Sequence, residues 1–83
     1  MTRKEQIDLD ENGVFTVGTI VRTYEIRSKG TFIEYLFMQN GKEYKGHQPV
    51  KLEVRQGECY MVKYSEKDPE HSMMILTEKK HCN

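Results

Sequence analysis

Two cysteines and three histidines are the side chains of this 83-residue chain best suited to metal binding or covalent chemistry: Cys59, Cys82, His47, His71 and His81. A structural zinc site takes about four such ligands, usually in closely spaced pairs. The sequence has no C-x-x-C pair and no H-x-x-x-H pair. We therefore predict no metal site.

Nucleophilic catalysis would need a thiol or hydroxyl with a base and an orienting carboxylate beside it. Cys59 with His47 or His71 is the one combination to consider, but Cys59 lies in an apolar alternation without a glycine elbow. No G-x-G-x-x-G and no P-loop is present. We predict no catalytic residue, no cofactor and no enzymatic activity.

The pairing of the two cysteines is left open by the sequence. Two are too few for a disulfide scaffold of the small secreted kind. Cys59 has the setting of a packed thiol, and Cys82 is the penultimate residue. The simpler interpretation is one packed thiol and one thiol in the tail, with an internal disulfide as the alternative, so the redox compartment stays open.

The segments of the sequence that would position any such site are predicted to be strands. Residues 14–26 are rich in β-branched and aromatic residues, which suit a pleated surface. Their length and Gly18 predict a long strand with a bulge or bend at the glycine. Ser28-Lys29-Gly30 predicts a turn, and residues 31–39 the next strand, apolar on both faces and so partly covered on both. Asn40-Gly41 is the strongest hairpin signal, because a type I′ turn needs positive φ at both positions.

The second half of the chain continues the pattern. A third strand is predicted over residues 42–46, interrupted by His47-Gln48-Pro49. Residues 50–54 alternate as a short half-buried strand or extended connection. Residues 58–64 and 72–77 are the last two predicted strands, separated by the polar turn at Asp68-Pro69.

Short strands joined by turns indicate an all-β fold. At this length a five- or six-stranded antiparallel barrel, or a strongly curled sheet, hides the sheet edges and makes one core. We predict a polar lead-in over residues 1–13, a single β domain over 14–77 and a polar tail over 78–83. The predicted core comprises Val17, Val21, Ile33, Tyr35, Phe37, Tyr44, Tyr60, Val62, Tyr64 and Ile75.

Charge and hydropathy bear on partners. Thirteen basic and thirteen acidic side chains give no net charge, which argues against nucleic acid as a partner. No apolar run approaches the roughly 20 residues of a transmembrane helix. The N-terminus has no apolar core of a signal peptide.

The order of motifs over residues 17–76 resembles a family of small bacterial β-barrel domains of unknown function, many of them tethered to the cell envelope. The motifs are Gly18-x-Ile20-Val21, Tyr35-x-Phe37-x-x-Asn40-Gly41-x-x-Tyr44-x-Gly46, Gly57-Glu58-x-Tyr60-x-Val62-x-Tyr64-Ser65, Asp68-Pro69 and Ser72. The resemblance implies a small barrel and no activity. It implies the cell envelope if an anchor precedes the chain, and otherwise the cytoplasm is expected.

We therefore expect a non-catalytic binding or structural module, the soluble part of a cell-envelope protein, with an unknown protein partner. The predicted docking residues are Val50, Leu52 and Val54, because Pro49 beside them is typical of an edge strand, where a partner strand can add. The alternative interpretation is a short edge protected by its charges. The competing function is an OB- or SH3-like barrel that stacks single-stranded nucleic acid. Its candidate residues are Arg22, Tyr24, Arg27, Tyr44, Lys45, Tyr60, Lys63 and Tyr64. The sequence gives no oligomeric state.

Overall fold

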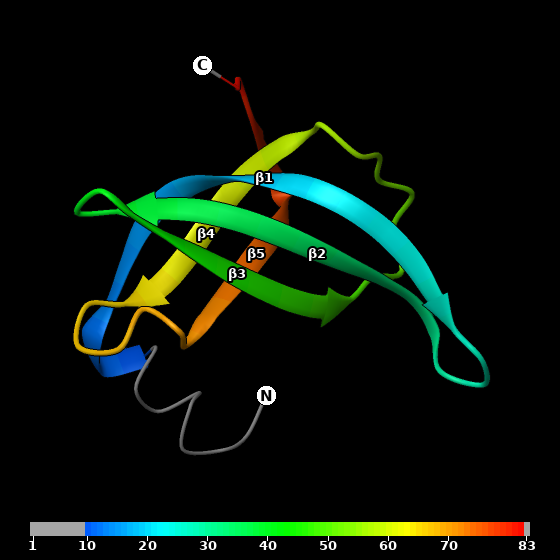
Figure 1. Cartoon of the computed structure of the whole chain (residues 1–83), viewed down its shortest axis with the longest axis horizontal. Helices are drawn as coiled ribbons and strands as arrows, with labels where there is room; N and C mark the ends of the chain where they lie inside the picture. The colour runs from blue at the N-terminus through cyan, green and yellow to red at the C-terminus, as the bar shows by residue number, and fades with distance from the viewer. Residues whose placement is uncertain (1–9, 83) are drawn as a thin grey trace.

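Five antiparallel strands form one sheet in the computed structural model, which describes residues 10–82 (Figure 1). The strands are β1 (Gly13–Ile26), β2 (Gly30–Gln39), β3 (Lys42–Pro49), β4 (Cys59–Ser65) and β5 (Ser72–Lys80). Their order in the sheet is β3-β2-β1-β4-β5. The all-β prediction is confirmed. The sheet is curled but not closed into a barrel, because β3 and β5 are its two edges.

The long strand β1 curls the sheet because it changes partner along its length. Its first half pairs with β4 from Gly13 to Thr19, and its second half pairs with β2 from Thr19 to Ile26. The register shifts between Ile20 and Arg22, so the bulge lies at Val21 and not at Gly18 as predicted. Gly18 faces β4, where a Cβ atom would lie 2.6 Å from Cγ2 of Val62. Glycine is favoured at this position because the Val62 side chain, with Leu36 O at 3.1 Å, fills the space that a Cβ atom would take.

The predicted hairpin at Asn40-Gly41 is confirmed. Asn40 and Gly41 have φ of 53° and 75°, the positive values of a type I′ turn. Phe37 then pairs with Tyr44 in the β2–β3 register. The strand β3 continues through Gln48 to its last residue, Pro49, so the predicted interruption at residues 47–49 is wrong.

The core lies on the concave face of the curled sheet. Its buried residues are Ile20, Ile33, Tyr35, Phe37, Tyr60, Val62, Tyr64 and Met74, with Tyr44 packed against them. Three core predictions are wrong: Val17 is 43% exposed, and Val21 and Ile75 are half-buried. Side chains alternate between the faces of a strand, and Gly18, Ile20 and Met74 hold the inward positions.

Side chains join the two edge strands where the sheet would close. Gln48 of β3 donates from Nε2 to Met74 O on β5 (2.9 Å) and accepts from the Met74 N–H at Oε1 (2.7 Å). The ring of Tyr35 covers Gly46, and its hydroxyl bonds Ser72 Oγ at 2.9 Å. Gln48 thus takes the place of a peptide group between β3 and β5.

Of the two interpretations predicted for residues 50–54, the connection is correct, whereas the last strand runs farther than predicted. Residues 50–54 are an extended connection without strand pairing, although the Val50 N–H still donates to Thr31 O at 2.9 Å. The strand β5 runs to Lys80, so residues 78–80 of the predicted tail belong to the sheet. In residues 10–82 no helix is long and apolar enough to span a membrane.

Candidate functional site

The convex face of the sheet carries large apolar side chains that no described element covers. Phe15 is 58% exposed, Val17 43% and Met38 56%. Half-buried neighbours from three strands, β2, β4 and β5, complete the face; they are Leu36, Met61, Met73 and Ile75. The register places Val17 beside Met61 and Met61 beside Ile75, so these side chains form one surface. We call these seven residues the outer face.

A groove opens in the outer face where β1 leaves β2. The two strands pair only as far as Thr19 and Leu36, and beyond that point β1 turns to β4. The groove between them has a volume of about 410 Å³, and Val17, Leu36 and Met38 line it. Glu43 of β3 also lines it, as the neighbour of Met38 in the register. The result is an apolar hollow with a carboxylate at one rim.

Phe15 stands beside this groove with a cation over its ring. It pairs with Lys63 in the β1–β4 register, and the Lys63 Nζ lies 5.9 Å from the ring centroid. Phe15 and Val17 are two residues apart on β1, so both side chains point to the outer face. An exposed aromatic ring and an apolar hollow are therefore neighbours on one surface.

A polar cluster occupies the other end of the convex face. Arg22 Nε donates to Glu34 Oε1 at 2.8 Å, and its guanidinium lies 4.4 Å from the centroid of the Tyr24 ring. His47 Nδ1 is 3.1 Å from the Tyr24 hydroxyl, and its Nε2 is 3.9 Å from Glu34 Oε2. The bond from Arg22 lowers the pKa of the Glu34 carboxyl. The charges pair with one another, which is typical of a solvated surface and not of an anion site.

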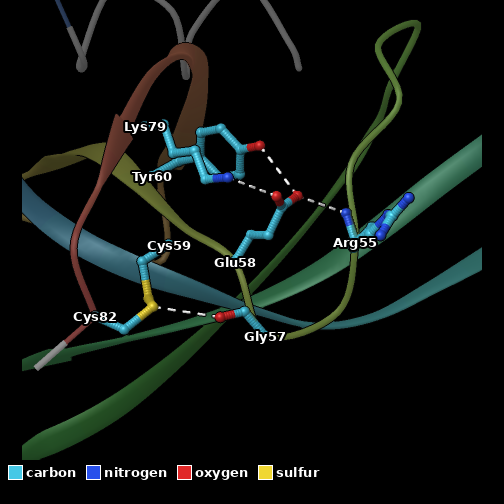
Figure 2. Close-up of polar contacts among 7 residues, drawn as sticks. All are labelled: Arg55, Gly57, Glu58, Cys59, Tyr60, Lys79 and Cys82. Carbon is cyan, nitrogen blue, oxygen red and sulfur yellow. Dashed lines mark hydrogen bonds and ion pairs between the residues drawn. A yellow bond between two sulfur atoms is a disulfide. The ribbon is translucent and has the colours of Figure 1, made fainter.

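The C-terminal end of β5 is held to β4 by a second cluster, centred on Glu58 (Figure 2). Its Oε2 accepts from Lys79 Nζ at 2.8 Å, and its Oε1 accepts from the Arg55 N–H at 2.7 Å and the Tyr60 hydroxyl at 3.2 Å. The Lys79 and Arg55 donors lower the pKa of Glu58, and the Glu58 carboxylate raises the pKa of Lys79. These contacts hold the end of β5 against the residues that directly precede β4.

A disulfide between Cys59 and Cys82 completes that fastening, with a Cα–Cα distance of 5.5 Å (Figure 2). The prediction of two unpaired thiols is wrong, and the alternative of an internal disulfide is correct. Cys59 is only 2% exposed, whereas Cys82 is exposed and its sulfur lies 3.3 Å from Gly57 O. Thr19 Oγ1 lies 3.2 Å from the Cys59 sulfur. Because Cys59 is bonded to Cys82, its sulfur is not a free nucleophile in this state.

The predicted docking residues lie together in the connection between β3 and β4, which is not an edge strand. Val50 and Val54 are half-buried and pack against the core, while Leu52 is 52% exposed. All three line a shallow hollow with Thr23 and Thr31. Of the three, Leu52 offers most of its surface to a partner.

The histidines considered as ligands do not gather. His47 lies on β3 in the Tyr24–Glu34 cluster, and His71 Nε2 is 3.5 Å from Asp68 Oδ2. His81 follows β5. Over residues 10–82 no group of three or more His, Cys, Asp or Glu side chains is placed to hold a metal ion.

The aromatic residues considered for nucleic acid are mostly turned inward. Tyr60 and Tyr64 are 6% and 5% exposed, and Tyr44 stacks on Phe37 with centroids 5.6 Å apart. Tyr24 is half-buried beneath Arg22. Base stacking needs exposed aromatic faces, and the ring faces of these tyrosines are mostly covered.

The residues that sequence reasoning missed are those of the outer face. The sequence pattern predicts Val17 and Ile75 in the core and indicates no role for Phe15. The apolar second face of β2 was expected to be covered, but Met38 on that face is exposed. The alternation of Phe15 and Val17 could have indicated this face. Since Gly18 points inward, Val17 and Phe15 point to the opposite side of the strand.

No family model matches the chain, and no curated protein or solved structure is significantly similar to it.

Proposed function

We propose that this chain is a non-catalytic binding module that docks a partner through its outer face. The observation that carries the proposal is the exposure of Phe15, Val17 and Met38 side by side on a sheet whose other face is a packed core. Full burial of one such side chain stabilises by about 1.5–3 kcal/mol. Since each is about half exposed, covering all three would contribute about 3 kcal/mol to binding.

The Cys59–Cys82 disulfide supports an oxidising compartment as the place of action. Structural disulfides persist in secreted, periplasmic and cell-surface proteins and are rare in the cytosol. This agrees with the resemblance to envelope-tethered bacterial domains. We therefore propose that the module is the soluble part of a cell-envelope protein.

Site-specific photo-crosslinking in the native cell tests the docking surface. A photoreactive amino acid replaces Val17 on the outer face, Leu52 in the connection before β4, or Lys29 in the β1–β2 turn. The proposal predicts a discrete crosslinked product from position 17 that Met38→Lys abolishes, and no such product from position 29. A product from position 52 and none from position 17 would assign docking to the Val50–Val54 connection instead and refute the outer face.

A further inference from the structure

We propose that the occupant of the outer face is a second copy of this chain, with Phe15 of each copy seated in the β1–β2 groove of the other. The inference rests on the proposed function and names its partner. Two observations carry it: the fit of a projecting ring to a neighbouring hollow, and the charges attached to each.

The projecting part is Phe15 with Lys63. Phe15 is the most exposed of the large apolar side chains in the part of the chain that the structure describes, at 58%. It lies in the first half of β1, where β4 supports it from one side through the Phe15–Lys63 register pair. The strand β1 thus presents an exposed aromatic ring, a residue type enriched at protein interfaces, with a cation beside it.

The receiving part is the groove lined by Val17, Leu36 and Met38. Its volume of about 410 Å³ is ample for one phenyl ring, and its lining is apolar apart from threonines and Glu43. Glu43 lies at the β3 side of the groove, beside Met38. Lys45 lies two residues beyond Glu43 on β3, beside Leu36, and does not line the groove.

The placement of ring and groove allows a closed dimer. In a two-fold symmetric interface the same surface is used by both copies, so every contact occurs twice. Phe15 and the groove are adjacent on the outer face, and both can therefore be engaged at once when two sheets pack face to face, as in a β-sandwich. When Phe15 enters the groove, the adjacent Lys63 approaches the partner's Glu43. The cation of Lys63 lies beside the projecting ring, and the carboxylate of Glu43 lies beside the groove, so the charges of the two surfaces are complementary.

Sedimentation equilibrium of the full chain tests the dimer over total concentrations from about 10 µM to about 1 mM, the range of a small interface. We expect a reversible monomer–dimer equilibrium. Phe15→Glu should weaken it by at least about 100-fold, because each dimer loses two anchors. Ile26→Glu is the matched control, since Ile26 is also exposed, at 37%, but lies at the far end of β1. It should leave the equilibrium unchanged.

A charge exchange tests the orientation of the two copies. Glu43→Lys alone should weaken the dimer by about 10-fold, through repulsion of Lys63. Glu43→Lys combined with Lys63→Glu should restore it to within about threefold of the original chain. Circular dichroism and thermal melting of each variant verify that the sheet is intact, so that a lost dimer is not an unfolded chain.

Several outcomes overturn the dimer. They are a chain that stays monomeric over the whole range, a dimer that Phe15→Glu leaves intact, and a charge exchange that restores nothing. A monomer in the centrifuge with a crosslink from position 17 to a different protein overturns this inference and leaves the proposed function standing. A monomer without any crosslink from position 17 overturns both.

Discussion

Removing the side-chain amide of Gln48 should loosen the joint between the two edges of the sheet. Gln48→Ala deletes both hydrogen bonds to Met74, at 2.9 Å and 2.7 Å, and no main-chain ladder between β3 and β5 replaces them. A partly buried hydrogen bond contributes about 1 kcal/mol net. The loss should therefore be about 2 kcal/mol of the free energy of unfolding, or about 8–16 °C in Tm for a domain of this size.

A second substitution at the same position separates the hydrogen bonds from the size of the side chain. Gln48→Glu keeps length and shape, but a carboxylate only accepts. It retains the bond from the Met74 N–H and sets an unpaired charge against Met74 O. We expect a loss of at least 2 kcal/mol near pH 7. The unpaired charge raises the pKa of the new carboxyl in the folded chain, so the loss should shrink as the pH falls through that raised pKa and be smallest below about pH 4, where the carboxyl is protonated and can donate to the carbonyl.

Urea unfolding monitored by circular dichroism measures both variants against the unsubstituted chain at each pH. Gln56→Ala is the control, because Gln56 is an exposed residue of the turn before β4; it should change the free energy of unfolding by less than about 0.5 kcal/mol. If Gln48→Ala is as mild as Gln56→Ala, the amide does not hold β3 to β5 and the reasoning about the joint is refuted.

Three further predictions concern the turn, the disulfide and the C-terminal ion pair. Gly41→Val forces a β-branched residue to a φ of 75° and should lower the free energy of unfolding by about 1–2 kcal/mol or more, as measured by thermal melting. Gly41→Asn should lower it much less. Equal melting temperatures of the two variants would contradict the turn. Cys82→Ser opens the link to Cys59 across 23 residues and should cost about 3.4 kcal/mol in urea unfolding. The cost should vanish when both proteins are measured in a reductant, and a cost that persists there would argue against the disulfide as its source. Because the pKa of Glu58 is lowered from 4.5, its stabilising effect is complete above that value and is lost as the pH falls through the lower folded pKa. Lys79→Met should raise the Glu58 pKa toward 4.5 in an NMR titration, and an unchanged pKa would show that the ion pair is not its cause.

The strands and turns could be predicted because their signals are local. The positive φ at Asn40 and Gly41 follows from two adjacent residues, and the alternation in β4 follows from the pleat. Each strand was placed to within a few residues on this basis, except that β3 and β5 each run three residues farther than predicted. Apart from Pro49 their extra residues are polar, and the strands extend because β2 pairs with residues 47–49 and β4 with Lys79 and Lys80.

The faces of β1 and β5 could not be predicted, because they depend on the register in which each strand pairs with its neighbours. A shift of one residue exchanges the two faces of a strand. The bulge lies at Val21 and not at Gly18, and β5 shifts against β4 between Tyr60 and Met61. Ile20 points inward because it pairs with the buried Tyr35, and Met74 because it pairs with the buried Val62, whereas Val21 and Ile75 were predicted in the core.

The disulfide and the outer face depend on contacts between residues distant in sequence. Cys59 meets Cys82 because β5 continues to Lys80, which pairs with Cys59 in the register. That extension was hidden by the polar residues 78–80. The outer face was missed for a related reason, since only the sheet order shows that no described element covers Phe15 and Met38.

The apparent mass of the protein in a gentle extract of the native cell tests the central claim that the outer face is a docking surface. Native gel electrophoresis of the unsubstituted chain, Val17→Glu and Leu52→Glu separates the possibilities, because the first variant places a charge in the outer face and the second outside it. We expect a complex larger than the monomer that Val17→Glu dissociates and Leu52→Glu leaves intact. A complex that survives Val17→Glu, or a chain that migrates as a free monomer in all three samples, would contradict it.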